Sequence, residues 1–295
     1  MLLGDGRDVV AWHRPGGAAP VAGTAAGRVR WEGVDLLDRA TVRAALERER
    51  PAAVYHCGGA AHVGRSWEKT EPTFATNVRG THHVIEGLRD FQIRARVLLP
   101  SSAMVYAAAS EPLREDHPIA PGSPYALSKL AQELVGSGNP GGPDVMIARA
   151  FNHFGPRQDP FFVASGFARR IADIESGRWA PEIDVGNLES RRDLTDVRDT
   201  VRAYRLILER GTPGRAYNVC TGRAVAIHDL LQMMLSRANV PIAIKIDPAR
   251  YRPNDLPLLL GDPGRIHAEL GWKAETPIER TIDDLLAYWR GRGRE

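Results

Sequence analysis

The chain has 295 residues, of which 43% are apolar and 25% are charged, and this balance is typical of a soluble globular protein with one large or two modest domains. Its 39 basic and 36 acidic side chains leave a net charge of +3 and form no Lys/Arg block, which argues against a nucleic-acid partner. A mildly basic surface does suit a polyanionic small molecule such as a nucleotide.

Other bulk features point to the cytoplasm. No apolar run approaches the ~20 residues of a membrane span, and Asp5 and Arg7 near the start do not fit a signal peptide. Cys57 and Cys220 form no C-x-x-C motif, so we expect no metal site and interpret both as small core residues in a reducing compartment.

Through residue 150, short β-branched apolar runs alternate with helical patterns. We expect strands at 8–13, 28–36, 52–57, 95–100 and 144–150, and helices at 38–50, 73–90 and 123–136. Asp38 is a good N-cap for the first helix. This alternation predicts βαβ units and a mostly parallel sheet, with ligands at the carboxyl ends of the strands.

After residue 150 the loops lengthen, and Gly, Pro and Arg interrupt them. We expect helices at 162–176, 196–210, 226–237 and 279–290, and one buried strand at 216–220. Asp196 and Asp199 are interpreted as helix-start residues. This second half is expected to be a smaller mixed α/β cap that binds substrate.

Tyr125 and Lys129 are four residues apart in a helical pattern and therefore share one helix face. An ammonium beside a phenol favours the phenolate, and such a phenol can exchange a proton with a carbinol or carbonyl oxygen. Ser102, at the end of the preceding strand, could hydrogen-bond that oxygen. The alternative is an ordinary surface pair, because Y-x-x-x-K also occurs by chance.

Four segments resemble one family in their order and spacing. They are "SSAMVY…SPYALSK" (101–129), "VDLLD" (34–38), "YHCGGAAHVGRSWEKTEPTFATNVRGT" (55–81) and "RAFNHFGPRQ" (149–158). They resemble the extended short-chain dehydrogenase/reductases of the NAD-dependent nucleotide-sugar epimerase/dehydratase group. The resemblance implies a Rossmann-type doubly wound parallel sheet, here placed at residues 1–150, and a cap at 151–295 with some segments that return to the main domain.

The resemblance also implies residue roles. Ser102, Tyr125 and Lys129 would be catalytic, with Ser102 also touching substrate. The implied cofactor contacts are Asp35 (at the adenine), Leu36, Cys57, Gly58, Gly59, Asn77, Tyr125 and Lys129. Asn152 would reach the diphosphate of a sugar nucleotide. A homodimer through the helices at 73–90 and 123–136 is implied in the same way.

The second half resembles the GDP-sugar branch, which contains GDP-mannose 4,6-dehydratases and GDP-4-keto-6-deoxymannose reductases. Arg192 and Arg252 are expected to lie in loops rich in Gly, Pro and Asp and to contact phosphate, because a guanidinium can bind phosphate with two parallel hydrogen bonds. Asp255 is expected to accept from a ribose hydroxyl. The alternative for each arginine is a solvated surface charge.

Met104 argues against one of the candidate reactions, dehydration, but not against epimerisation, which needs no acid at this position. The family's dehydratases carry a Glu two residues after the catalytic hydroxyl, where this chain has Met104, and a thioether cannot carry a proton. We therefore expect an NAD(P)-dependent oxidoreductase that reduces the C4 ketone of a GDP-4-keto-6-deoxyhexose. A GDP-sugar dehydratase or epimerase is the alternative.

The N-terminal segment departs from the family pattern. The chain starts at "MLLGDGRDVVAWHR", so we expect the first strand and its Gly-x-x-Gly-x-x-Gly loop to be missing, about 20–25 residues of a βαβ unit. Either the start was assigned too late or trimmed, or the chain is a catalytically impaired sugar-nucleotide-binding protein. His13 and Arg14 end the second strand without an acid, which favours NADP(H) over NAD(H) because Arg accommodates the 2′-phosphate.

Overall fold

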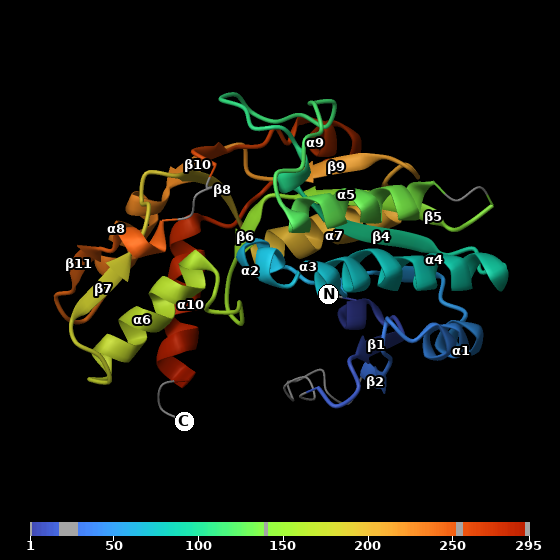
Figure 1. The fold of residues 1–295 in the computed structure, drawn as a ribbon, viewed down its shortest axis with the longest axis horizontal. Helices are drawn as coiled ribbons and strands as arrows, with labels where there is room; N and C mark the ends of the chain where they lie inside the picture. The colour runs from blue at the N-terminus through green and yellow to red at the C-terminus, as the bar shows by residue number, and fades with distance from the viewer. Residues whose placement is uncertain (1, 18–28, 139–140, 252–255, 293–295) are drawn as a thin grey trace. The chain divides into compact units, whose positions relative to one another are not determined.

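The computed structural model describes residues 2–17, 29–138, 141–251 and 256–292 (Figure 1). The chain divides into two compact units. Residues 1–99 and 123–145 form the first unit, and residues 100–122 and 146–295 form the second. The predicted division at residue 150 stays a prediction.

The first unit combines parallel strand pairs with helices. Its elements are η1 (Leu2–Asp5), β1 (Val9–His13), β2 (Val29–Gly33), α1 (Arg39–Glu49), β3 (Ala53–Tyr55), α2 (Val63–Glu68), α3 (Thr70–Phe74), η2 (Ala75–Arg79), α4 (Gly80–Asp90), most of β4 (Arg96–Ser102), α5 (Pro124–Ser137) and the start of β5 (Asp144–Ala150). Strand β1 pairs in parallel with β2, and β3 pairs in parallel with β4. The amide of Asp144 donates to the Ala95 carbonyl oxygen, which places the start of β5 beside β4.

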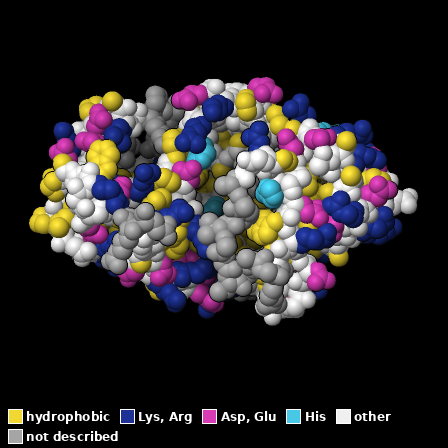
Figure 2. Space-filling model, turned by 90° about the horizontal axis from the view of Figure 1, so that it is seen from below, with side chains coloured by type: hydrophobic (Ala, Val, Ile, Leu, Met, Phe, Trp, Pro, Cys, Tyr) yellow, Lys and Arg dark blue, Asp and Glu magenta, His cyan; other side chains and the backbone are white. Residues whose placement is uncertain are grey.

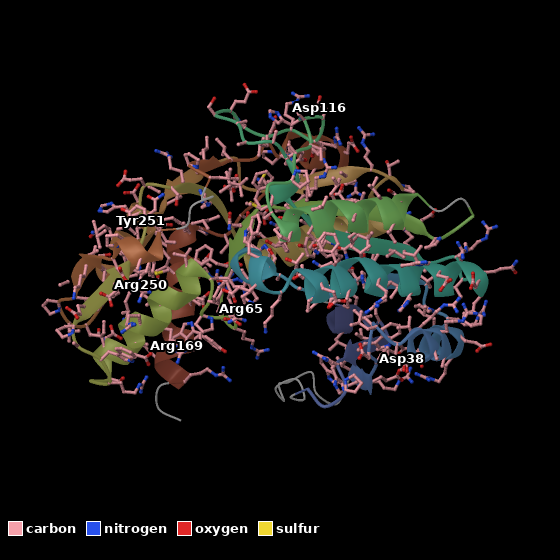
Figure 3. The ribbon with its side chains drawn as sticks, in the orientation of Figure 1. Asp38, Arg65, Asp116, Arg169, Arg250 and Tyr251 are labelled. Carbon is pink, nitrogen blue, oxygen red and sulfur yellow. The ribbon has the colours of Figure 1, made fainter. Side chains whose placement is uncertain are left out.

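Helix α1 begins as its sequence predicts. The Asp38 carboxylate accepts from the Ala40 and Thr41 amides, and Asp38 lies at the start of α1 in Figure 3. Helices α1 and α4 pack on a core in which every member is buried, made of Val34, Val42, Ala45, Leu46, Val84, Ile85, Leu88, Ile93, Ala95, Val97, Leu99 and Val145. The predicted helix at 73–90 is instead a continuous run from Thr70 in which η2 is a wider π-helical turn.

The second unit contains shorter strands and longer helices. Its elements are the end of β4, η3 (Ala103–Val105), most of β5, β6 (Asn152–Phe154), α6 (Val163–Glu175), β7 (Glu182–Val185), β8 (Arg191–Asp196), α7 (Val197–Arg210), β9 (Ala216–Val219), β10 (Ala224–Ala226), α8 (Ile227–Leu235), β11 (Ala243–Ile246), η4 (Pro248–Arg250), β12 (Leu258–Leu259), α9 (Gly264–Leu270) and α10 (Ile278–Arg292). Strand β5 pairs in parallel with β9, and β7 does so with β11. Strand β8 is parallel to β6 and β12 and antiparallel to β10.

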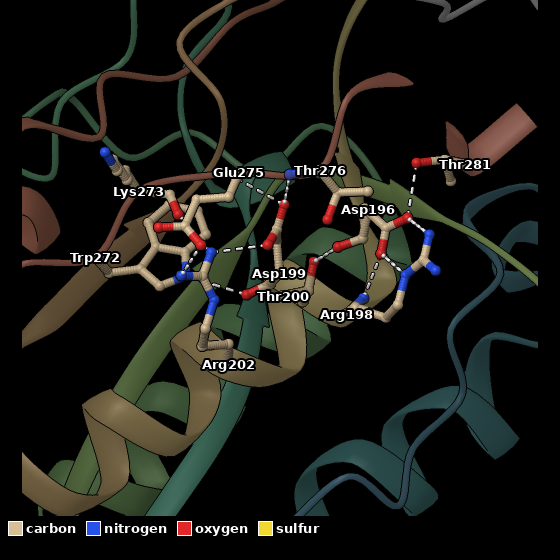
Figure 4. A network of polar contacts seen from close by, with 10 residues as sticks. All are labelled: Asp196, Arg198, Asp199, Thr200, Arg202, Trp272, Lys273, Glu275, Thr276 and Thr281. Atoms are coloured by element: carbon tan, nitrogen blue, oxygen red, sulfur yellow. Dashed lines mark hydrogen bonds and ion pairs between the residues drawn. The ribbon is translucent and has the colours of Figure 1, made fainter. Parts of the chain in front are cut away.

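Two aspartates anchor the last segment of the second unit onto α7 (Figure 4). Asp196 accepts from the Arg198 amide as the N-cap of α7, and its other oxygen accepts from the Thr281 hydroxyl at 2.7 Å. Asp199 accepts from the Glu275 and Thr276 amides at 2.9 and 2.8 Å. Asp196 therefore caps the helix, and Asp199 lies in its first turn, as predicted, but the Asp199 carboxylate binds the backbone of the 275–276 segment.

These elements confirm the predicted fold class, a mixed α/β chain with parallel sheets. The strands β6, β7, β8, β10, β11 and β12 and the helices α2 and α9 were not predicted. Each of these strands has only two to six residues, which is too short for a clear alternating pattern. Within the described ranges, no helix is both long and apolar enough to cross a membrane.

The charges on the face drawn in Figure 2 are mixed. Lys and Arg side chains are interspersed there with Asp and Glu side chains and with apolar ones. This agrees with the small net charge of +3.

Candidate functional site

The Tyr–Lys pair lies on α5, whose start the sequence specifies. Ser123 is the N-cap and accepts from the Ala126 amide, and Pro124 occupies the first turn, where its missing N–H costs nothing. Tyr125 and Lys129 follow on one helix face, and only 9% and 8% of their surfaces are exposed. The pair is buried, so the interpretation as an ordinary surface pair is wrong.

Two serines fix the backbone at Tyr125. The Ser66 hydroxyl, on α2, accepts from the Tyr125 amide at 3.1 Å and donates to the Val63 carbonyl. The Ser128 hydroxyl donates to the Tyr125 carbonyl at 2.7 Å. The first turn of α5 is therefore held by side chains of α2 and of α5 itself.

Asn77 connects α5 to the loop after β3. Its amide oxygen accepts from the Ala60 amide at 2.7 Å, and its amide nitrogen donates to the Ala60 carbonyl and to Ser128 Oγ. The side chain is fully buried and lies in the π-helical turn η2. Such turns are frequent at functional sites because they re-aim side chains. Asn77 thus holds the loop that the sequence predicts to lie along a dinucleotide.

The surroundings of Lys129 set its charge. Burial lowers the pKa of the Lys129 ammonium to about 8, against the opposing effects of Cys57 and Glu133. Burial, together with Lys129, lowers the pKa of the His56 imidazole to about 4. At neutral pH, Lys129 is therefore mostly charged and His56 is neutral.

Two glycines leave the end of β3 bare. A Cβ at Gly58 would come within 2.6 Å of Leu36 Cδ1, and a Cβ at Gly59 would come within 2.9 Å of Asn77 Oδ1 and 3.8 Å of Lys129 Nζ. At Gly59 the crowded atom belongs to the buried, hydrogen-bonded Asn77, whereas at Gly58 it is the flexible end of Leu36. With glycine at both places, the backbone carries no side chain that would block the close approach of a ligand. This bare backbone, which at Gly59 lies near Lys129 Nζ, fits the close approach of a dinucleotide.

The remaining cofactor candidates of the first unit lie in loops. Asp35 Oδ1 accepts a hydrogen bond from the Leu37 amide. The Leu36 carbonyl oxygen lies 2.8 Å from His83 Nδ1 on α4 and accepts a hydrogen bond from it. Arg14 follows β1 and is exposed. Cys57 is also exposed, so its interpretation as a core residue is wrong, because it follows β3 into an open loop. Cys220 is buried, as predicted.

Ser102 belongs to the second unit. Its hydroxyl is the N-cap of η3 and accepts from the Met104 amide at 3.2 Å. Because that bond uses an oxygen lone pair, the hydroxyl proton is left to donate. Its predicted partnership with Tyr125 stays a prediction.

The structure describes two of the four remaining residues predicted to bind substrate, Asn152 and Arg192. Asn152 is exposed on β6. Arg192 lies in β8 and not in a loop as predicted, because 191–196 pairs with three strands, and its guanidinium donates to the Leu256 and Arg191 carbonyls. Arg252 and Asp255 lie outside the described residues.

Sequence reasoning missed four polar residues around the pair, namely His56, Ser66, Thr81 and Gln132. Gln132 and Thr81 had a usable signal, because they stand three and four residues after Lys129 and Asn77 and so share their helix faces. His56 and Ser66 had no such signal.

The comparisons with known proteins establish the family of the chain. The family described as GDP-mannose 4,6 dehydratase matches residues 19–285. The chain belongs to this family. The family membership confirms the predicted epimerase/dehydratase resemblance and the predicted class of enzyme, an NAD(P)-dependent oxidoreductase type that acts on a nucleotide sugar.

Three matches to this chain are informative. The chain is 35% identical over 252 residues to GDP-6-deoxy-D-mannose reductase of Pseudomonas aeruginosa, and the match covers 84% of this chain and 83% of that protein. It is similar to a structure of RMD from Pseudomonas aeruginosa complexed with NADPH (TM-score 0.81, 30% identity, 93% and 92% covered). It is also similar to a Thermus thermophilus UDP-glucose 4-epimerase complex with NAD (TM-score 0.84, 25% identity, 98% and 93% covered).

These findings support a nicotinamide cofactor for the family member described here. They do not separate NADP from NAD, since the two structures contain different forms. Among the described residues, no group of three His, Cys, Asp or Glu side chains could hold a metal ion. The dimer and the cytoplasmic location stay predictions.

We predict that Asn77→Asp destabilises the protein. Aspartate keeps the oxygen that accepts from Ala60 but cannot donate to the Ala60 carbonyl or Ser128, and it introduces a buried charge. The free energy of unfolding, measured by urea denaturation, should fall by about 2–3 kcal/mol. The same substitution at exposed Asn239 is the control and should change it by less than about 0.5 kcal/mol. Equal effects at both positions would contradict the bridging role of Asn77.

Proposed function

We propose that the protein reduces the C4 ketone of a GDP-4-keto-6-deoxyhexose, with NADPH as the favoured hydride donor. One observation carries the proposal: Tyr125 and Lys129 are buried on one face of α5, beside the bare backbone of Gly58 and Gly59. The resemblance to a reductase and to an NADPH-bound structure supports the same reaction.

The residues of this chain supply the proton chemistry. A bound reduced nicotinamide supplies the hydride. The Tyr125 hydroxyl donates its proton to the C4 oxygen of the sugar, which becomes a hydroxyl, and the resulting phenolate later regains a proton from solvent. The Lys129 ammonium stabilises that phenolate, because an opposite charge nearby favours the ionised form. Ser102 donates a second hydrogen bond to the same oxygen.

Met104 favours the reductase over a 4,6-dehydratase. Dehydration requires an additional group that removes the C5 proton and protonates the leaving C6 hydroxyl. Residue 104 is a methionine, so its side chain is a thioether. Its backbone amide donates to Ser102 Oγ. A thioether neither accepts nor releases a proton at neutral pH. Ketone reduction needs no further acid, and the Ser–Tyr–Lys set is sufficient for it.

The choice of NADPH rests on Arg14. It is an exposed cation directly after β1, at the place where NAD-specific folds of this type carry an acid for the ribose hydroxyls. A guanidinium pairs with a 2′-phosphate by charge-assisted hydrogen bonds. NADH is the alternative donor.

Asn152 and Arg192 are the proposed contacts to the diphosphate of the substrate, and Arg252 and Asp255 are proposed from the sequence alone. Asn152 is exposed, so its amide is accessible. Arg192 would have to exchange part of its bonding to the Leu256 carbonyl for the phosphate. A crystal structure with GDP, in which these side chains stayed remote from the diphosphate, would exclude them.

We further propose a homodimer through α5. Leu127 and Leu134 are exposed by 47% and 64% and lie seven residues apart, and half-buried Leu130 and Ala131 lie between them. Residues at this spacing share one helix face. A second copy of the same helix would cover this apolar stripe.

The substitution Tyr125→Phe tests the reaction. Turnover of GDP-4-keto-6-deoxymannose, followed by the loss of NADPH absorbance, should fall at least ~100-fold because the proton donor is lost. The control Tyr288→Phe on α10 removes a hydroxyl remote from α5 in sequence and should retain activity. Undiminished turnover of Tyr125→Phe, or a wild-type protein that dehydrates GDP-mannose and reduces no ketone, would refute the proposal.

The substitution Arg14→Ala tests cofactor choice. The ratio of kcat/KM with NADPH to kcat/KM with NADH should fall about tenfold, since one charge-assisted bond is worth about that factor. Arg7→Ala, another exposed cation near β1, is the control. An unchanged ratio in Arg14→Ala would exclude contact between Arg14 and the 2′-phosphate.

The substitution Leu134→Glu tests the dimer. A charge in the middle of a buried apolar interface opposes association, so sedimentation velocity should show a monomer where the wild type shows a dimer. Ile246→Glu on β11 replaces a side chain of similar exposure, 62%, and should leave the dimer intact. A monomeric wild type, or a dimeric Leu134→Glu variant, would exclude this interface.

A further inference from the structure

Four buried polar side chains form a chain of hydrogen bonds in the first unit. Lys129 Nζ donates to Gln132 Oε1 at 2.8 Å, and Gln132 Nε2 donates to Thr81 Oγ1 at 2.9 Å. His56 Nε2 lies 2.8 Å from the same Thr81 oxygen. None of the four side chains is more than 8% exposed. The chain connects α5, α4 and the residue after β3.

Counting donors fixes the direction of each bond. The Thr81 hydroxyl has one proton, and it donates that proton to the Asn77 carbonyl at 2.7 Å. Its oxygen can therefore only accept from Gln132 and from His56, which uses both lone pairs. The Gln132 amide nitrogen must face Thr81, and its oxygen must face the ammonium. A flipped amide would set two donors against each other at Lys129.

The titratable groups near Lys129 explain why this orientation matters. Across the described residues, these are His56 and Cys57, which directly follow β3, and Tyr125 and Glu133, which lie four residues before and after Lys129 on α5. His56 is neutral, because burial and Lys129 lower its pKa to about 4. The Gln132 oxygen is thus a fixed neutral acceptor that favours the charged form of a buried amine.

We propose that Gln132 is a positioning residue: its amide oxygen fixes the Lys129 ammonium and keeps it charged, while Thr81 and His56 hold that amide in the required orientation. The kinetic part of this inference rests on the proposed reductase function. The titration of Lys129 itself does not.

The competing interpretation is that Gln132 is only a polar link between α4 and α5. Such a link would contribute to stability, but its removal would leave the titration of Lys129 unchanged. The protonation of Lys129 is therefore the quantity to measure.

The sequence makes that measurement direct. The chain contains four lysines, Lys69, Lys129, Lys245 and Lys273, so NMR of protein labelled at lysine Cε gives four signals. Lys129→Arg assigns one of them. The other three lysines are exposed and serve as internal references.

The wild-type Lys129 signal should titrate with a pKa of about 8. In Gln132→Met, which keeps the length and loses the acceptor, the midpoint should fall by about one pH unit. In Gln132→Glu, which keeps an acceptor oxygen and adds a negative charge, it should rise. Gln232→Met on α8, an exposed glutamine, is the matched control and should leave the midpoint unchanged.

Thr81 offers a second matched pair. Thr81→Val removes the hydroxyl that orients the Gln132 amide, so the Lys129 midpoint should fall in the same direction. Thr81→Ser retains the hydroxyl and should restore the wild-type midpoint. If Thr81→Val lost stability but left the Lys129 midpoint unchanged, Thr81 would not orient the Gln132 amide as proposed.

Activity gives the kinetic counterpart. The alkaline limb of the kcat profile, where the ammonium is lost, should move down with Gln132→Met and up with Gln132→Glu. A Lys129 midpoint that is the same in wild type, Gln132→Met and Gln132→Glu would overturn the inference. If the wild type reduced no ketone, the proposed reaction would fail, and the NMR titration would still decide the role of Gln132.

Discussion

A buried ammonium is the constraint on which the first unit depends. Removing a charge from water costs several kcal/mol unless hydrogen bonds compensate for it, and only 8% of the Lys129 surface is exposed. Gln132 on α5 itself accepts from the ammonium. Other buried polar side chains line α5 and the helices packed on it, where an ordinary helix seam would be apolar, namely Ser66, Asn77, Thr81 and Ser128. A buried polar seam of this kind is stabilising only when each polar group has a hydrogen-bond partner. This requirement accounts for the many hydrogen bonds among these side chains.

A second feature of the polar seam is the irregular helix before α4. Asn77 lies in the π-helical turn η2, and its side chain satisfies both backbone groups of Ala60. The loop with Gly58 and Gly59 is thereby tied to α5, so the bare backbone and the Tyr–Lys pair are held by one network. Preorganisation of this kind supports proton transfer, because small displacements of the donor are costly in rate.

The sequence predicted the regular parts and missed the network. Asp38, Ser123 and the Tyr125–Lys129 spacing are local signals, and each describes what the structure has. Asn77 in the π-helical turn bonds residues 17 and 51 positions away, and His56 and Thr81 are 25 positions apart. Periodicity carries no information about contacts over such separations. Arg192 illustrates the opposite failure. Its Gly- and Pro-rich surroundings suggested a loop, but pairing of β8 with three partners overrides local composition.

The fold and the Tyr–Lys pair do not by themselves select the reaction. Reductases, dehydratases and epimerases in the comparisons share this architecture over most of the chain, and all of them need a group that exchanges a proton with a sugar oxygen. What distinguishes the 4,6-dehydratases from the other two is a second proton transfer, at C5 and C6. Here the position two residues after Ser102 offers only the side chain of Met104, while its amide occupies one lone pair of the serine hydroxyl. A single side chain next to a shared framework therefore argues against dehydration, which family membership alone leaves open. The distinction from an epimerase, which needs no acid at residue 104 either, rests on the resemblance to a reductase.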